Sequence, residues 1–577
     1  MLISNAVFAQ YYMKGVVHDN NGTGLYNARI YLKSKKNILF TTGSSGAFGI
    51  PAPIATDSIT IVAEGFDTLF TVALSGNYNV YTLKIQVAGA SRSKNNRVFS
   101  FSKSDDSSHA PLLLYYHGSE SYAPLVQNKF LETEQYPETG FTLNTDCASY
   151  SNVRRFLNNG LEVPPNAVRI EEMLNYFDCS IIPAENYSDT FAFKSKLTLC
   201  PWNSKNRLFF LNMQAPLINL DSLPPCNLVF LIDVSGSMEG QNRLTLLQKS
   251  LKMLVKNLRM QDSVAIVVYG GTTGVLLQPA GGCDKELIND VIDKLSAGGE
   301  TPGEAAIKLA YQVASRMKSN KADTRVILAT DGDFNVGISN EQDLEDLITD
   351  YRQSGIYLTC LGVGMGNYKD SKMEVLARKG NGNYAYIDDV EEGEKVLVKE
   401  FTKTVYTVAD DAWMTTVFNP ACVKSSRLIG FDNTLTSSKN APEETEGGEL
   451  GTGHNILAAF EMVMNKDSVS EGDGELAAVT LFYRQPGSVD NCTQQFSAPC
   501  RYENIQPQDS ILIFASCVVM FGEKLKGSPY GNEISWDEII TLAKSITSPA
   551  NYIQNEFIGL VEKAKKIYPG EKKRKKE

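Results

Sequence analysis

The sequence predicts a multidomain protein in which a doubly wound, parallel α/β sheet is flanked by β-sandwich domains. Three observations support this fold class. The chain has 577 residues, which is too long for one hydrophobic core and suggests about three or four domains. Residues 227–400 alternate short apolar runs with helical stripes, as parallel sheets with crossover helices do. The segments before and after it contain short β-rich runs separated by turn residues, which is typical of sandwiches.

The charge balance and the hydropathy pattern exclude two classes of partner. The chain carries 66 acidic and 55 basic residues, a net charge of −11. This charge opposes nonspecific attraction to nucleic-acid backbones and anionic lipid surfaces, so we expect no nucleic-acid partner. No uninterrupted apolar run approaches the roughly 20 residues that a membrane-spanning helix needs. We therefore expect no transmembrane segment.

The ten cysteines are compatible with export but do not form a dense disulfide framework. Cys492 and Cys500 flank a short polar segment and are the pair that the sequence favours. Cys360 lies within an apolar run and is expected to be a small buried hydrophobe. No CxxC motif occurs, so a zinc knuckle or a redox dithiol has little support.

The N-terminus indicates export. Residues 1–10 end in a Val-Phe-Ala sequence before Gln10 that looks like a signal-peptidase site. We interpret this segment as a signal-peptide remnant, which would place the protein in the periplasm, at the cell surface or outside the cell. A frayed apolar terminus remains the alternative. Residues 88–125, rich in Ser, Lys, Asn and Asp over their first part, are expected to be a linker.

The first domain, residues 11–87, is predicted to be a small β-sandwich because short β-rich runs alternate with turn clusters. Its segments Gly15–Asp19, Thr42–Ile50 and Ala63–Phe66 resemble the carboxypeptidase regulatory-like domain. His18 has no histidine partner nearby, so we assign it no metal or catalytic role.

The region before the α/β sheet, residues 126–226, contains two predicted amphipathic helices. Apolar residues in 153–157 and in 170–177 follow i, i+3, i+4 spacing. Glu171 and Glu172 are adjacent carboxylates, but neighbours on a helix point about 100° apart. We therefore expect them on a solvated face and not in a catalytic pair.

The residues that carry chemistry follow the first strand of the α/β domain. Asp233, Ser235 and Ser237 stand at alternate positions directly after the apolar run 227–232. One carboxylate and two hydroxyls suit a hard divalent cation such as Mg²⁺, which prefers oxygen ligands and keeps several waters. Gly236 allows the backbone to bend between the two serines.

Two later residues complete a ligand set. Thr301 lies in a Gly-Gly-Glu-Thr-Pro-Gly segment, and Asp331 follows the apolar strand 326–329. Ligands of open α/β sheets bind outside the carboxyl ends of the strands, so Asp233 and Asp331 should meet at one edge. Glu300 and Asp333 stand beside this set and are treated as bystanders.

In residue type, order and spacing, these five residues resemble the metal-ion-dependent adhesion site of von Willebrand factor type A domains. The resemblance implies a bound Mg²⁺, with Mn²⁺ or Ca²⁺ as alternatives. Ser235, Ser237 and Thr301 would coordinate directly, and Asp233 and Asp331 directly or through water. A partner's Asp or Glu would fill an open position. The alternative without a metal is that Asp233 and the serines only cap the following helix.

The regions around the α/β domain resemble the YfbK-like family of bacterial von Willebrand type A proteins. The resemblance implies an N-terminal flanking region at 126–226, a type A domain at 227–400, a β-rich C-terminal region at 401–548, and a C-terminal helix with a basic tail at 549–577. His454 is expected to be a structural histidine, because no nucleophile or carboxylate stands at a recognisable spacing. The segments that carry the resemblance are Asp146–Leu157, Val168–Phe177, Lys403–Ala409, Phe418–Ala421, Ser426–Phe431 and Gly448–His454.

Three functions compete. The favoured one is an exported, non-enzymatic adhesion or scaffold protein that binds a partner carboxylate through its metal. The second is a Mg²⁺-dependent, phosphatase-like hydrolase using Asp233 and Asp331, although Ser235 stands where phosphoaspartate enzymes of the haloacid dehalogenase type carry a second acid. The third is a structural cell-envelope protein with a fold-stabilising cation. Partner identity and oligomeric state remain open.

Overall fold

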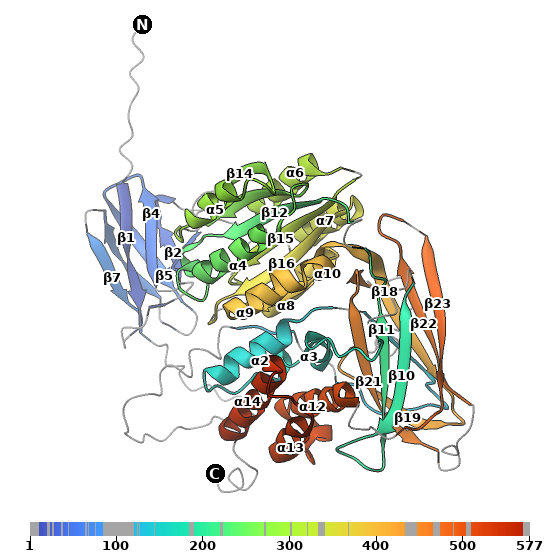
Figure 1. The fold of residues 1–577 in the computed structure, drawn as a ribbon. Helices are drawn as coiled ribbons and strands as arrows, with labels where there is room; N and C mark the ends of the chain where they lie inside the picture. The colour runs from blue at the N-terminus through green and yellow to red at the C-terminus, as the bar shows by residue number, and fades with distance from the viewer. Residues whose placement is uncertain are drawn as a thin grey trace. The chain divides into compact units, whose positions relative to one another are not determined.

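The computed structural model describes residues 11–84 and 120–568, except 20–23, 26–27, 36–38, 44–45, 64–65, 67, 76, 124, 126, 144, 184–189, 220–222, 271–272, 300–302, 320, 333–340, 367, 433–446, 466–473, 489 and 504–508. The chain divides into two compact units, Met1–Asp106 and Ser107–Glu577, which are drawn in Figure 1. The predicted signal remnant at 1–10, most of the predicted linker, and Glu300, Thr301 and Asp333 lie outside the described residues.

The first unit contains two small sheets with the strand orders β4-β1-β7 and β3-β2-β5-β6. In β2 and β5 buried and exposed residues alternate, so one face of their sheet packs on a shared core that includes Met13, Ile30 and Ile61. This arrangement confirms the predicted β-rich first domain. Its strands are β1 (Tyr11–His18), β2 (Arg29–Leu32), β3 (Leu39–Thr41), β4 (Ala47–Ala52), β5 (Thr56–Val62), β6 (Leu69–Leu74) and β7 (Tyr78–Thr82).

The second unit is built around a six-stranded sheet of order β14-β13-β12-β15-β16-β17, in which every neighbouring pair except β13–β14 is parallel. The apolar runs that predict strands in the sequence are all strands in the structure: 228–232, 264–268, 326–329, 357–363 and 384–387. The strand that sequence reasoning missed is β14, a largely exposed edge strand. The six strands are β12 (Cys226–Asp233), β13 (Ser263–Tyr269), β14 (Gly274–Gly281), β15 (Asp323–Thr330), β16 (Ile356–Val363) and β17 (Tyr384–Ile387).

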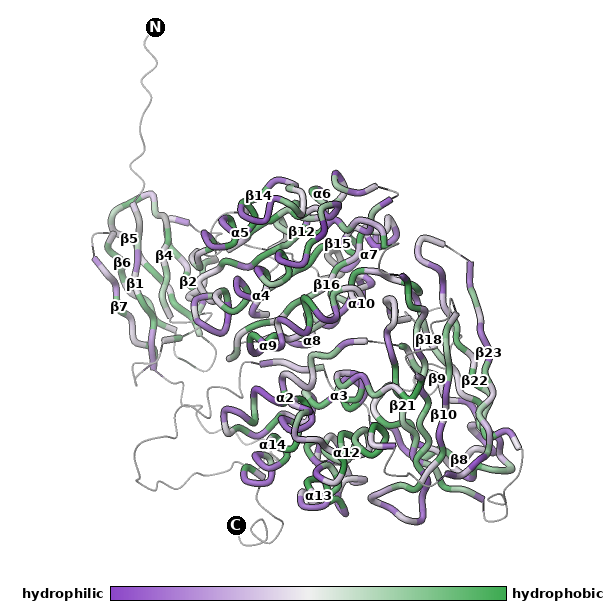
Figure 2. The backbone as a smooth tube through the Cα atoms, viewed as in Figure 1, coloured by the Kyte–Doolittle hydropathy of each residue, from purple (hydrophilic) through white to green (hydrophobic). Residues whose placement is uncertain are grey.

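Helices cover both faces of this sheet, so its central strands are buried throughout (Figure 1). Leu228 and Phe230 of β12 pack in one core, and Val229 and Leu231 pack in the other. Because both faces of the sheet are covered by helices, β12, β15 and β16 are hydrophobic along most of their length (Figure 2). The helices are α4 (Leu244–Asn257), α5 (Lys285–Asp293), α6 (Gly303–Met317), α7 (Glu341–Gln353), α8 (Asp370–Lys379), α9 (Val390–Glu394), the π-helix η5 (Lys395–Lys399) and α10 (Phe401–Val405).

The regions on either side of the α/β domain fold together. Strands from before it pair with strands from after it, β11 with β21, β9 with β18 and β8 with β19, and both resulting sheets contribute to one core. These strands are β8 (Leu131–Glu132), β9 (Glu138–Thr142), β10 (Ala192–Leu199), β11 (Arg207–Gln214), β18 (Thr407–Phe418), β19 (Val423–Ile429), β20 (Gly448–Gly451), β21 (Asn455–Met464), β22 (Glu475–Arg484) and β23 (Asn491–Pro499).

A helical layer completes this part and corrects one prediction. The two predicted amphipathic helices are present as α2 (Ala148–Asn158) and α3 (Ile170–Tyr176). The apolar run 511–514 predicts a further strand of the β-rich C-terminal region, but it lies within α12 (Ser510–Leu525). That helix packs with α13 (Trp536–Ile546) and α14 (Tyr552–Ile567) in a single core, so residues 510–567 are mainly helical and not β-rich.

Buried ion pairs attach the flanking parts to the α/β sheet. Arg154 of α2 is 4% exposed and pairs with Asp388, which follows β17, and with Glu392 of α9. Arg325 of β15 pairs with Glu449 of β20 at 2.6 Å. Breaking such a pair leaves a buried charge uncompensated, at a cost of about 3–5 kcal/mol. These contacts predict that the three regions unfold together.

Two expectations about single residues are wrong. Glu172 was expected on a solvated face, but it is buried, accepts a hydrogen bond from Ser149 N at 2.8 Å and pairs with Arg169. Cys492 and Cys500 are not joined by a disulfide bond. Cys492 lies on β23 and Cys500 directly follows this strand. Because an extended strand rises about 3.3 Å per residue, the two cysteines are too far apart for a disulfide bond. Cys360 is fully buried, as predicted.

Candidate metal centre

The sheet brings the predicted ligands to one edge. Ile232 of β12 is in register with Ala329 of β15, so Asp233 and Asp331 emerge at the carboxyl ends of adjacent parallel strands. Ser235 directly precedes the short 3-10 helix η4 (Gly236–Met238), and Ser237 lies within it. Four of the five predicted residues are therefore neighbours in the structure, and the fifth lies outside the described residues.

The segment before Thr301 also reaches this loop. Gly298 N donates to Val234 O at 2.7 Å, and Gly236 N donates to Gly299 O at 3.1 Å. These two backbone hydrogen bonds hold the Gly-Gly pair that precedes Thr301 against the Asp-Ser-Ser loop.

Asp233 is fully buried and held in one orientation. Its Oδ1 accepts a hydrogen bond from Ser235 N at 2.9 Å, and its Oδ2 accepts from Thr330 Oγ1 at 2.8 Å and from the Tyr269 hydroxyl at 3.1 Å. Burial raises the pKa of the Asp233 carboxyl, and these hydrogen bonds oppose the rise. Sequence reasoning missed Tyr269 and Thr330, although Thr330 directly precedes Asp331.

The two serine hydroxyls lie side by side, with 2.9 Å between Ser235 Oγ and Ser237 Oγ. Neither the 3-10 helix nor α4 receives a side-chain capping hydrogen bond at its N-terminus, and α4 begins only at Leu244. The helix-capping alternative is therefore contradicted for these serines.

The arrangement fits a hard divalent cation. Octahedral Mg²⁺ binds oxygen at about 2.0–2.1 Å, which places adjacent ligands about 3 Å apart, and the serine hydroxyls have this spacing. The described donors are two carboxylates and two hydroxyls, an oxygen set that suits Mg²⁺, Mn²⁺ or Ca²⁺. Within the described part of the chain, no group of three or more His, Cys, Asp or Glu could hold a metal ion.

Two glycines allow the loops to pack this closely. Gly270 has φ +125°, and a Cβ there would lie 2.1 Å from Ser235 N. Gly332 has φ +89°, and a Cβ there would lie 2.5 Å from Lys369 N. Each position requires both the backbone freedom and the small size of glycine.

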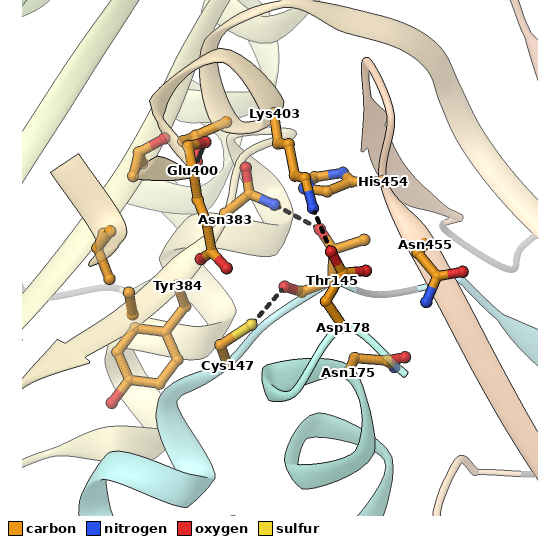
Figure 3. A pocket seen from close by; sticks show the side chains of 14 residues that line it. Thr145, Cys147, Asn175, Asp178, Asn383, Tyr384, Glu400, Lys403, His454 and Asn455 are labelled. Carbon is orange, nitrogen blue, oxygen red and sulfur yellow. Dashed lines mark hydrogen bonds and ion pairs between the residues drawn. The ribbon is translucent and has the colours of Figure 1, made fainter. Parts of the chain in front are cut away.

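A polar pocket far from this edge contains His454 (Figure 3). The cavity measures about 50 Å³, room for roughly three to five waters. Lys403 Nζ donates to Asp178 Oδ2 at 3.1 Å across it. His454 Nδ1 accepts from Gly451 N at 2.8 Å, and burial with nearby Lys403 lowers the pKa of His454 to about 3. A neutral, hydrogen-bonded imidazole agrees with the predicted structural role.

Family comparisons divide the second unit into three consecutive parts. The family model described as von Willebrand factor matches residues 116–209, the von Willebrand factor type A domain matches residues 227–401, and the C-terminal part of the uncharacterized protein YfbK matches residues 403–567. The order and approximate bounds follow the architecture described above.

The chain is also similar to individual proteins. Uncharacterized protein YfbK of Escherichia coli (strain K12) is 38% identical over 472 residues, which is 78% of this chain and 81% of YfbK. Inter alpha-trypsin inhibitor, heavy chain 4, of Mus musculus is 27% identical over 171 residues, 28% of this chain and 18% of that protein. A solved von Willebrand factor type A structure from Catenulispora acidiphila is 13% identical with a TM-score of 0.38, covering 63% of this chain and 88% of that one.

Proposed function

The chain belongs to the YfbK family of von Willebrand factor type A domain proteins, and from this premise we propose that it is a metal-dependent protein-interaction module. Type A domains mediate protein interactions and often bind a divalent cation. The proposed ligands are Asp233, Ser235, Ser237, Thr301 and Asp331, and the proposed cation is Mg²⁺, with Mn²⁺ or Ca²⁺ as alternatives. The proposed ligand on the partner is an Asp or Glu carboxylate.

One observation supports the proposal most strongly. The hydroxyls of Ser235 and Ser237 lie 2.9 Å apart beside the fully buried carboxylate of Asp233. The hydrogen bonds from Tyr269 and Thr330 fix that carboxylate, so the donors do not have to be ordered when a cation binds.

The donor set also favours an acidic partner. When bound, the cation would supply a Lewis-acidic position that exchanges water for an external oxygen ligand. Because Ser235, Ser237 and Thr301 are neutral, only Asp233 and Asp331 in the proposed set offset the charge of the cation, which would then attract an anionic external ligand more strongly than in an all-carboxylate set. The roles proposed for these residues are binding and orientation, without turnover.

The proposal extends to location and to the first unit. The residues before Gln10 support export to the periplasm, the cell surface or the medium. We also propose that the first unit is a carboxypeptidase regulatory-like sandwich, since its two sheets enclose one core. Within the described residues no helix is long and apolar enough to cross a membrane.

The test is affinity capture from a cell-envelope extract with the full chain, in Mg²⁺ and in EDTA. The variant is Ser235→Ala with Ser237→Ala, and the control is Ser354→Ala, an exposed serine just before the amino end of β16. A partner retained only in Mg²⁺, by the wild type and the control but not by the double variant, supports the proposal. Identical capture under all conditions would move the function to the flanking β-domains.

A further inference from the structure

Arg243, the residue before α4, lies between the two halves of the candidate metal site. Its Nη1 donates to the carbonyl oxygen of Ser237, and its Nε lies 3.9 Å from Asp331 Oδ2. A positive charge thus stands beside one proposed ligand and is hydrogen-bonded to the backbone of another. Nothing in the Asp-Ser-Ser pattern indicated this residue.

The guanidinium is held from its far side by the loop after β16. Arg243 Nη2 donates to Met365 O at 2.7 Å. Gly364 has φ +80°, and a Cβ there would lie 2.7 Å from Arg243 Nε, so the loop fits around the side chain. Two residues after Gly364, Gly366 donates its N–H to Glu120 Oε1 at 2.8 Å.

Glu120 anchors this loop to the flanking region. Its carboxylate pairs with both terminal nitrogens of Arg155, at 2.8 and 2.9 Å, and both side chains are almost completely buried. Ser121 N also donates to Tyr368 O at 3.0 Å. The segment that precedes α2 therefore supports the loop against which Arg243 rests.

The charge has two opposite consequences at the site. Asp331 is 0% exposed in this ion pair, and a buried carboxylate without a nearby cation is unstable. Arginine stays charged at every accessible pH, so Arg243 stabilises Asp331 when no metal is present. The same charge repels a cation that binds to Asp331.

We propose that Arg243 sets the affinity of the metal site, stabilising the metal-free protein and weakening cation binding so that the metal remains exchangeable. Glu120 is a positioning residue that holds Arg243 through the loop Gly364–Gly366. The inference rests on the proposed function, because it requires that a cation binds at Asp233 and Asp331.

The test is calorimetric titration of the full chain with Mg²⁺. Arg243→Gln removes the charge, and we expect its dissociation constant to fall about ten-fold, with the difference shrinking at high salt. Arg243→Lys retains the charge and should bind as the wild type does. Lys252→Gln removes a charge on the same helix, from an exposed pair with Asp293, and should leave Mg²⁺ affinity unchanged.

A second measurement separates charge from misfolding. In EDTA, Arg243→Gln should melt at a lower temperature than the wild type, and Mg²⁺ should raise its melting temperature by more. Binding by Arg243→Gln that is equal to or weaker than wild type would overturn the inference, as would an equal gain in Arg243→Lys. If the wild type does not bind Mg²⁺, the proposed function is contradicted. If Arg243→Gln nevertheless binds Mg²⁺, the role of Arg243 is still supported.

Discussion

Replacing Gly270 by alanine should disrupt the candidate metal site without touching a proposed ligand. The added Cβ would lie 2.1 Å from Ser235 N and 2.5 Å from Ser235 Cα, where ordinary contacts begin at 3.4 Å. The Ser235 backbone would have to move by about 1 Å, a displacement large enough to abolish ligand geometry. The φ of +125° adds about 1–3 kcal/mol of backbone strain in any residue with a side chain.

We therefore expect Gly270→Ala to lower the free energy of unfolding by about 3 kcal/mol and to weaken Mg²⁺ binding by at least about ten-fold. The matched control is Gly274→Ala at the start of β14, where a Cβ would meet nothing within 4 Å and φ is ordinary. The control should stay within about 0.5 kcal/mol of wild type. Urea unfolding and Mg²⁺ titration measure the two effects.

The comparison isolates the loop geometry, because both substitutions add one methyl group to the same hairpin region. Equal Mg²⁺ affinity in Gly270→Ala and Gly274→Ala would contradict the proposed site, since the Ser235 loop would then not hold the cation. A loss of stability with unchanged Mg²⁺ affinity would have the same meaning.

Two further predictions concern the rest of the second unit. Because the pKa of His454 is lowered to about 3 from 6.5, the unfolded state binds more protons between these values, and this group lowers the free energy of unfolding by up to about 1.4 kcal/mol per pH unit as the pH falls from 6.5 toward 3. His454→Asn keeps an acceptor for the Gly451 N–H, so urea unfolding from pH 7 to 4 should show a shallower loss, and parallel profiles would contradict this. Arg154→Met leaves Asp388 and Glu392 buried without their shared cation, so unfolding should cost about 3–5 kcal/mol less. A change below about 1 kcal/mol would show that this network does not join α2 to the sheet.

The α/β domain could be predicted because its signals are local. Five of the six strands are apolar runs, and Asp233 ends β12 while Asp331 directly follows β15. The exposed edge strand β14 lacks such a run. The helix α12 is apolar on most of its surface and is buried almost throughout, so periodicity did not distinguish it from a strand.

The remaining features depend on contacts between distant residues. The pairing of β11 with β21 joins strands on opposite sides of the α/β domain, which local patterns do not specify. Glu172 is buried because Arg169 and Ser149 satisfy it, and Arg243 acquires its place from the loop after β16. Residue types predicted the proposed metal ligands, but not the groups that orient Asp233.

The most direct test of the central claim is Mg²⁺ titration of the metal-free full chain by calorimetry, comparing wild type with the Ser235→Ala, Ser237→Ala double variant. The variant removes two neutral hydroxyls that hydrogen-bond to one another and keeps both carboxylates, so the fold should survive. We expect one Mg²⁺ per chain for the wild type and at least about ten-fold weaker binding for the variant. Equal binding by both proteins, or none by either, would contradict it.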